Sequence, residues 1–206
     1  MDAFVISLPH RQKPRERLML RLKSLGFTPR HHPGVISDVR RGGCQLPGEY
    51  GCLLAHRQLL EQVVLTERRV AIFEDDALPR NDLTAGIVQR ALSEFRYHAM
   101  VLLGASQYAW QHVRPYPGHY RATNKTSGTF AYVIGPQAAA LTIQAISRET
   151  DAMDRIYHRF IYPSLYVPVV QPLMFIADVR ESAIRGGRDP VQHAKKVRWD
   201  VNQYAA

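Results

Sequence analysis

The sequence is poor in cysteine and has no long apolar run, and both absences exclude whole classes of protein. Cys44 and Cys52 are its only cysteines, too few for a disulfide framework in a chain of 206 residues, so we expect reduced thiols. No stretch approaches the roughly 18 consecutive apolar residues of a transmembrane helix. The apolar run within residues 1–8 is too short for a signal peptide. The expected compartment is therefore the cytoplasm.

Ligands for a zinc ion are also scarce. Cys52 and His56 are one helical turn apart, so their side chains could share an ion. A zinc site needs three or four ligands, however, and no second pair has a spacing that would complete this one. The sequence therefore does not predict a zinc site.

The composition is that of a folded protein with basic ends. Hydrophobic residues make up 46% of the chain and charged residues 22%, which excludes a disordered or collagen-like chain. The net charge is +9, and residues 1–41 carry nine basic and three acidic residues, while residues 180–206 carry six and three. Basic ends attract nucleotide diphosphates, acidic glycolipids, an anionic membrane face or nucleic acid. The alternative is a solvated surface that keeps the protein soluble.

Apolar segments of strand length alternate with segments of helical periodicity. The run at 3–8 predicts a buried first strand, and Leu18, Leu22 and Leu25 predict a helix that ends near Gly26. Residues 27–47 predict an irregular connection that contains one short strand. Beyond it, the patterns predict strands at 70–73, 99–103, 130–134 and within 165–176, and helices at 48–69, 82–95 (capped by Asp82) and 136–147. The alternation predicts an α/β fold, a single domain with a Rossmann-like, mostly parallel central sheet flanked by helices.

Two segments fall outside this alternation. Residues 104–128 are polar, aromatic and rich in glycine and proline, which is typical of a long functional loop, and we expect a hairpin within it over a cleft. Residues 185–206 show little apolar periodicity. We therefore predict a domain at 1–184 and a basic C-terminal tail at 185–206 that acts as a lid or an arm, anchored by Trp199 and Tyr204.

Three acidic residues, Glu74, Asp75 and Asp76, follow the strand at 70–73 directly. Ligands of open α/β sheets bind beyond the carboxyl ends of the strands, and Mg²⁺ and Mn²⁺ prefer carboxylate oxygens and phosphates. Since alternate residues of an extended chain face the same way, Glu74 and Asp76 are the predicted metal ligands. The alternative is a helix cap with exposed turn acids.

Two segments carry a resemblance to a known family. Residues 46–56 read LPGEYGCLLAH and residues 70–78 read VAIFEDDAL, and they resemble the "GEiGCalSH" and "ilEDDa.l" motifs of glycosyltransferase family 25, the lipooligosaccharide-type galactosyltransferases. Five further segments resemble family motifs in the same order, at 5–17, 100–104, 128–138, 152–154 and 172–184. The chain departs from the pattern at Ala55, where the family has serine, and at Ala183, where it has aspartate.

The resemblance implies a GT-A-like fold and a metal-dependent, inverting transfer of a hexose. The expected donor is a UDP-sugar, UDP-galactose or UDP-glucose, the expected cofactor is Mn²⁺ or Mg²⁺, and the expected acceptor is a hydroxyl of a glycan or glycolipid such as lipooligosaccharide. The basic ends agree with peripheral contact to an anionic membrane, at the inner membrane face.

The same resemblance assigns donor-binding and catalytic groups. The donor site is expected to use six residues at the first strand and the acidic triplet: Ser7, Leu8, Arg11, Arg15, Arg17 and Asp75. A general base must take the proton of the acceptor hydroxyl, and we predict Asp154, with Asp151 and Glu49 as rivals. Each carboxylate has a structural alternative, because Asp151 and Asp154 are also suited to cap a helix and Glu49 to lie in a first helical turn.

Four further residues are predicted to contact the acceptor or the donor: His56, Tyr108, Trp110 and Ser182. Aromatic side chains in a loop stack on sugars or bases, whereas His56 is also suited to be a hydrogen-bonded core residue and Tyr132 to pack in the core. Two other functions stay open. One is the same chemistry on a nucleic-acid acceptor, and the other is a non-catalytic basic binding module on a decayed transferase scaffold.

Overall fold

The protein is described here from a computed structural model that covers residues 1–181, 184, 187 and 189–204. The largest sheet of the described residues has eight strands, in the order β2-β1-β3-β10-β5-β11-β8-β7. Their bounds are β1 Asp2–Ser7, β2 Thr28–Pro33, β3 Val70–Glu74, β5 Met100–Leu102, β7 Pro115–Tyr116, β8 His119–Arg121, β10 Ala131–Ile134 and β11 Pro168–Val170. Two small sheets pair β4 (Ala77–Pro79) with β12 (Phe175–Ala177), and β6 (Ser106–Gln107) with β9 (Thr126–Ser127).

Most strands of this sheet run in the same direction, as the sequence predicts, and β10 and β8 are reversed. β1 pairs in parallel with both β2 and β3, and β5 pairs in parallel with β11. β10 lies between β3 and β5 and is antiparallel to both, and β8 and β7 continue the sheet beyond β11 as antiparallel strands. The predicted fold class, a mostly parallel central sheet flanked by helices, is therefore confirmed.

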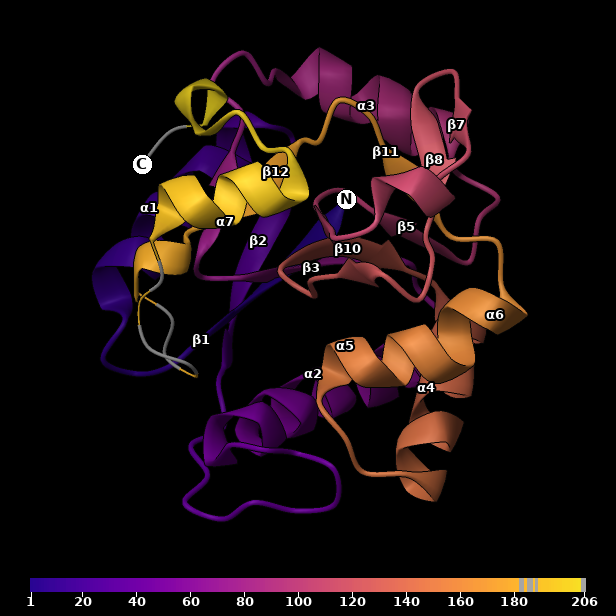
Figure 1. Ribbon diagram of the computed structural model, residues 1–206. Coiled ribbons are helices and arrows are strands. Elements are labelled where there is room, and N and C mark those ends of the chain that lie inside the picture. Colours follow the sequence, from indigo (N-terminus) through magenta and orange to yellow (C-terminus); the bar gives the residue numbers. More distant parts are fainter. Residues whose placement is uncertain (182–183, 185–186, 188, 205–206) are drawn as a thin grey trace.

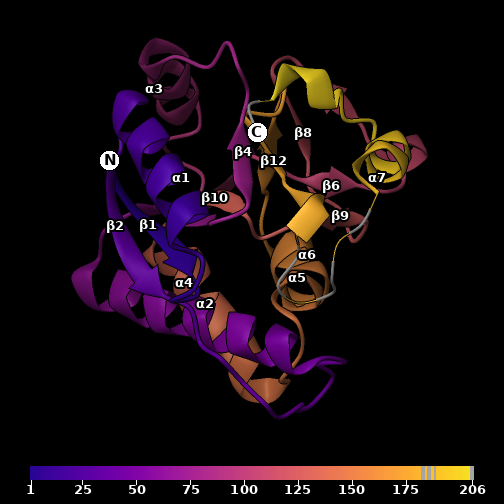
Figure 2. The ribbon, with the colours of Figure 1, turned by 90° about the vertical axis from the view of Figure 1, so that its left-hand side faces the viewer.

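Helices lie on both sides of this sheet (Figures 1 and 2). Three helices lie below the sheet in both views: α2 (Pro47–Thr66), α4 (Pro136–Arg148) and α5 (Met153–Ile156). Of these, α2 packs against α4. α3 (Ala85–Glu94) lies at the top in both views, α7 (Pro190–Val197) lies beside β6 in Figure 2, and α1 (Gln12–Ser24) packs against β1 and β2. A π-helical segment, Tyr157–Ile161, joins α5 to α6 (Tyr162–Ser164), and short 3-10 helices lie at Trp110–His112, Val179–Glu181 and Val201–Gln203. No helix of the described residues is long and apolar enough to cross a membrane.

The core lies where the inner strands meet these helices. Val5, Ile72 and Val133 on three neighbouring strands are fully buried. The ring of Phe73 packs against two other rings, with centroid distances of 5.4 Å to Phe27 and 5.0 Å to Phe175. Continuous apolar runs of this kind are typical of strands that are covered on both faces. The sheet therefore holds the ends of β1 and β3 in fixed positions.

Most predicted element positions agree with the structure, and one predicted cap is wrong. α3 begins at Ala85, and the side chain of Thr84 accepts a hydrogen bond from the backbone N–H of Ile87. Asp82 lies before the helix and pairs with Arg80. Thr84 immediately precedes the first helical residue, where an N-cap acts, so Asp82 is too early in the chain to cap α3.

The long loop at 104–128 has structure of its own. β6 and β9 pair at its base, and β7 and β8 form the predicted hairpin at its far end. Gly104 lies at the start of the loop, where a side chain would meet the Phe130 ring and the Phe175 carbonyl at 2.4 Å. Only glycine permits this close approach of three segments.

The described part of the C-terminal tail packs against the domain. Trp199 is 9% exposed and its indole N–H donates to the Ala105 carbonyl at 3.0 Å. The Tyr204 hydroxyl donates to the Leu173 carbonyl at 2.9 Å. Both residues are therefore anchors, as the sequence predicts, while the division of the chain at residue 184 stays a prediction.

Candidate active site

The acidic triplet lies where β3 ends, between two cavities. Glu74 is the last residue of β3, and Asp75 and Asp76 form the turn into β4. The backbone N–H of Asp75 donates to the Ile6 carbonyl at 3.1 Å, and that of Glu74 to the Phe130 carbonyl at 3.0 Å. The triplet is therefore fixed by β1 on one side and by the approach to β10 on the other.

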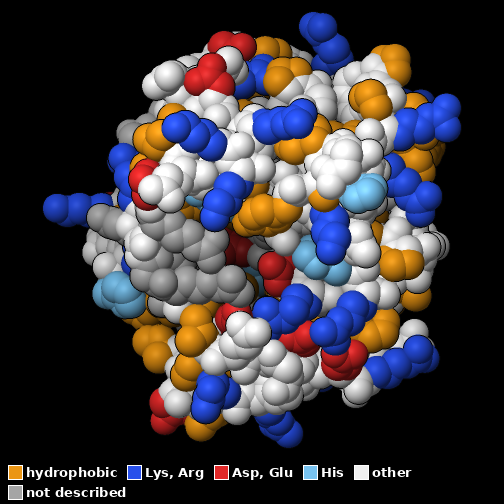
Figure 3. All heavy atoms as spheres, viewed as in Figure 1, with side chains coloured by type: hydrophobic (Ala, Val, Ile, Leu, Met, Phe, Trp, Pro, Cys, Tyr) orange, Lys and Arg blue, Asp and Glu red, His pale blue; other side chains and the backbone are white. Residues whose placement is uncertain are grey.

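The two cavities share one wall. The first, of about 350 Å³, is lined by Glu49, Tyr108 and Asp154, among others. The second, of about 260 Å³, is lined by Ser7, Leu8, Arg11, Asp75 and the segment 34–37. Four residues line both cavities: Cys52, Glu74, Asp76 and Ile184. Figure 3 shows acidic side chains in a hollow of this face, with Lys and Arg side chains around it.

Asp75 belongs to the second cavity and is held by two donors from the start of the chain. The Ser7 hydroxyl donates to its carboxylate at 2.6 Å, and Arg11 Nε donates to the other oxygen at 3.0 Å. The Arg11 and Asp75 side chains are only 14% and 11% exposed. Three of the predicted donor-binding residues thus form one connected group beside β1.

Glu74 is held by two side chains of other elements. His56 on α2 lies with Nε2 3.3 Å from Glu74 Oε1, and the Thr129 hydroxyl donates to the same oxygen. Burial raises the pKa of the Glu74 carboxyl, but the hydrogen bond and charge of His56 and the bond from Thr129 outweigh it, so the pKa is lowered. Glu74 is therefore a preorganised carboxylate.

Asp76 has the opposite environment. Burial, followed by the negative charges of Glu74 and Asp75, raises the pKa of Asp76 well above its usual value. Its Oδ1 atom is buried and accepts no hydrogen bond within the described part of the chain. A buried carboxylate oxygen without a partner is costly, and a divalent cation would satisfy it together with Glu74. The two residues therefore fit Mg²⁺ or Mn²⁺.

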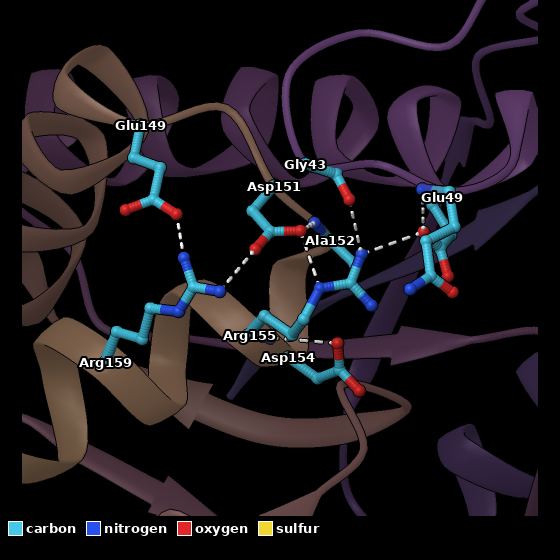
Figure 4. A network of polar contacts seen from close by, with 9 residues as sticks. Gly43, Glu49, Glu149, Asp151, Ala152, Asp154, Arg155 and Arg159 are labelled. Atoms are coloured by element: carbon cyan, nitrogen blue, oxygen red, sulfur yellow. Dashed lines mark hydrogen bonds and ion pairs between the residues drawn. The ribbon is translucent and has the colours of Figure 1, made fainter.

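The three candidate bases lie close together but differ in their contacts (Figure 4). Arg155 joins two of them, because its Nε donates to Asp151 at 2.6 Å and its terminal nitrogen donates to Glu49 at 3.0 Å. Asp151 also accepts from Arg159 at 3.2 Å and from the backbone N–H of Ala152. Asp151 and Glu49 are 2% and 4% exposed, so both carboxylates are buried and neutralised by arginine.

Asp154 lines the first cavity and lies outside this arginine network. Its carboxylate accepts the backbone N–H of Arg155 at 2.9 Å, and Figure 4 draws no bond from it to the guanidinium. It lies in the first turn of α5. Among the three carboxylates, Asp154 has the contacts that leave an oxygen to accept a proton.

The other predicted residues divide into those at the cavities and those away from them. Tyr108 is 44% exposed and lines the first cavity, while His56 is fully buried behind it. Arg15 lies near His31, and Trp110 donates to the Val197 carbonyl at 3.3 Å. Neither these two residues nor Arg17 line either cavity. Ser182 lies outside the described residues.

Some residues at the site are not predicted from the sequence. Thr129, which donates to Glu74, comes just before a predicted strand in a segment that resembles a family motif. That position in the sequence indicates a residue near the site. His193 also lines the first cavity, but it lies on α7 in the predicted tail, where no motif marks it. Arg155 follows Asp154 directly; its pairing with Asp151 is local, but its second partner, Glu49, lies on a distant segment that no local pattern connects to it.

No family model and no curated protein matches the sequence. Solved structures resemble it at low identity. A glycosyltransferase involved in the glycosylation of the major capsid of PBCV-1 aligns with a TM-score of 0.52 and 7% identity, over 96% of this chain and 98% of that one. An inositol-1-phosphate CTP transferase from T. maritima aligns with a TM-score of 0.47 and 10% identity, over 97% of this chain and 96% of that one. A UDP-glucose pyrophosphorylase complexed with UDP-glucose aligns with a TM-score of 0.44 and 10% identity, over 85% of this chain and 74% of that one. Together with the observed sheet, the first of these likenesses confirms the predicted GT-A-like fold.

Proposed function

We propose that the protein is a metal-dependent, inverting glycosyltransferase of family 25 that moves a hexose from a UDP-sugar to a hydroxyl of a glycan or glycolipid. The observation that carries this proposal is the arrangement of the two cavities on either side of Glu74 and Asp76. A donor and an acceptor in separate cavities would meet at this shared wall. The motif resemblance of the sequence supports the choice of family.

The second cavity suits the nucleotide. Arg11 offers a guanidinium at the end of β1, and Asp75 fixes its direction through the bond at 3.0 Å. A guanidinium is suited to the negative charge of a diphosphate. Asp76 and Glu74 would hold Mg²⁺ or Mn²⁺, which stabilises the charge that develops on the leaving diphosphate. These contacts orient the donor with its sugar toward the shared wall.

The first cavity suits the acceptor. Asp154 lines it and is the proposed base, which takes the proton of the acceptor hydroxyl as the new glycosidic bond forms. Attack from the side opposite the leaving diphosphate inverts the anomeric centre. Tyr108 on the long loop offers an aromatic face for a sugar ring. Arg155 holds Glu49 and Asp151 as ion pairs, which keeps these two carboxylates from competing for the proton.

The test is donor turnover with a panel of UDP-, GDP- and CMP-sugars, with Mn²⁺ or with EDTA, measured as released nucleotide. We expect metal-dependent release from a UDP-hexose, with faster release when a glycan acceptor is added. No turnover with any donor, together with no nucleotide binding in calorimetry, would reject the proposal and favour the binding-module alternative. Asp154→Asn should lose transfer and keep donor binding.

Membrane contact is part of the same proposal, because a glycolipid acceptor lies in a membrane. The basic residues at 1–41 and 180–206 would provide the electrostatic attraction. Sedimentation with anionic liposomes at low salt tests it, and no sedimentation would reject it. Binding to nucleic acid that falls steeply with salt would instead favour the nucleic-acid acceptor.

A further inference from the structure

A second group of side chains that can bind a metal shares Glu74 with the acidic triplet. Cys52 and His56 on α2 and Glu74 at the end of β3 bring one ligand atom each within 4.8 Å of the others. We propose that these three residues bind a thiophilic divalent cation of the Zn²⁺ class. The sequence spacing alone supplies two of these ligands, and the fold supplies the third by placing the end of β3 beside α2.

The histidine is already oriented for coordination. Its Nε2 lies 3.3 Å from Glu74 Oε1, and its Nδ1 lies 2.8 Å from the Tyr132 hydroxyl. Histidines that bind metals usually hold a polar partner with their second ring nitrogen, which fixes the ring and its tautomer. Tyr132 and His56 are both fully buried, so this orientation is rigid.

The chemistry of the three ligands selects a soft ion. Thiolate and imidazole prefer Zn²⁺, whereas Mg²⁺ and Mn²⁺ prefer oxygen ligands such as those of Asp76. A thiolate and a carboxylate together balance the charge of a divalent ion. On binding, the Cys52 thiol and His56 Nε2 each give a proton to the solvent, and the sulfur and the nitrogen bind the ion.

The site is reachable and keeps an open position. Cys52 and Glu74 line both cavities, so an ion enters from solvent, and three protein ligands leave a fourth position for water. Tetrahedral bonds of the usual length place ligand atoms roughly 3.5 Å apart. The nitrogen and the oxygen already have nearly this separation, at 3.3 Å, and the Cys52 sulfur lies within 4.8 Å of the other ligand atoms, so coordination requires only a small approach of the sulfur.

The proposed zinc site does not depend on the transferase activity, but zinc bound there would affect that activity. Glu74 belongs to both metal positions, so an ion bound through Cys52 would alter the carboxylate that serves the Mn²⁺ position. We expect Zn²⁺ to inhibit any Mn²⁺-dependent nucleotide release, and Cys52→Ser to relieve that inhibition.

Cobalt titration of the full chain, freed of metal by chelation, tests the site without any assay of turnover. Co²⁺ bound through a thiolate gives a near-ultraviolet charge-transfer band and strong visible bands when it is four-coordinate. We expect both bands in the wild-type protein and their loss when Zn²⁺ displaces the cobalt. Cys52→Ser should abolish the charge-transfer band, and the control Cys44→Ser, which changes the other cysteine, should keep it.

A second variant tests the orientation of the histidine. Tyr132→Phe removes the hydroxyl beside His56 Nδ1 and keeps the ring, so Zn²⁺ affinity in a chelator competition should fall about tenfold. Circular dichroism verifies the fold of each variant. The proposal is overturned if Co²⁺ gives no thiolate band, if the band survives in Cys52→Ser, or if it disappears in a folded Cys44→Ser.

Discussion

Replacing Arg155 by methionine should lower the free energy of unfolding by about 3 kcal/mol, because two buried carboxylates lose the cation that they share. The Glu49 and Asp151 side chains are 4% and 2% exposed, whereas that of Arg155 is 23% exposed. Removing one partner of a buried pair costs roughly 3 to 5 kcal/mol. The lower end applies here, because Arg159 keeps its bond to Asp151 at 3.2 Å. Methionine retains most of the aliphatic packing of the arginine.

Thermal unfolding followed by circular dichroism measures this effect. At roughly 2 to 4 °C per kcal/mol for a chain of this size, the midpoint should fall by about 6 to 12 °C. The matched control is Arg57→Met, which removes a pair with Glu61 whose side chains are 42% and 49% exposed, and it should cost at most about 1 kcal/mol. Adding Glu49→Gln to Arg155→Met should cost less than the sum of the single changes, because one unpaired charge is then absent. Equal effects of Arg155→Met and Arg57→Met would refute the reasoning.

Three further predictions concern the metal position and the C-terminal anchors. Asp76→Ala should abolish metal-dependent nucleotide release while the circular dichroism spectrum stays native, because the residue lines cavities rather than the core; full activity would contradict the metal assignment. Trp199→Ala should lower the free energy of unfolding by about 3 kcal/mol in urea titrations, whereas Trp199→Phe should cost clearly less because the ring remains. Burial raises the pKa of Tyr204 to about 12, so its hydroxyl contributes stability that is present below about pH 10 and is lost as the pH rises toward 12. Tyr204→Phe should therefore lose less stability between pH 9 and pH 11 than the wild type, and identical losses would show that Tyr204 ionises equally in both states.

The elements of the fold were predictable where a pattern is local. The apolar run before Glu74 and the helical spacing of leucines before Gly26 correspond to β3 and α1, because strand and helix periodicities are properties of a few neighbouring residues. The cap of α3 was assigned to Asp82 instead of Thr84, since both residue types serve as caps and only the helix start decides between them.

Individual residues of the site were predictable from the sequence, but the contacts between residues on different segments were not. The acidic triplet follows from its place after a strand, but no local pattern shows that Arg155 joins Glu49, a residue 106 positions away, to Asp151. The same holds for the pairing of Glu74 with His56 and Thr129, which come from α2 and from the approach to β10. Such contacts depend on the order of strands in the sheet, which a single sequence does not specify.

The reversed direction of β10 gives the long loop two neighbouring, fixed ends. Because β10 runs opposite to β5, the segment 104–128 starts and finishes at the same end of this strand pair, and Ser106 and Ser127 pair at its base. Within the segment, β8 pairs with β11 in the central sheet, so this part is fixed as well. Tyr108 lies outside these pairings and is 44% exposed, so a substitution there would change the wall of the first cavity on an unchanged framework of acidic residues.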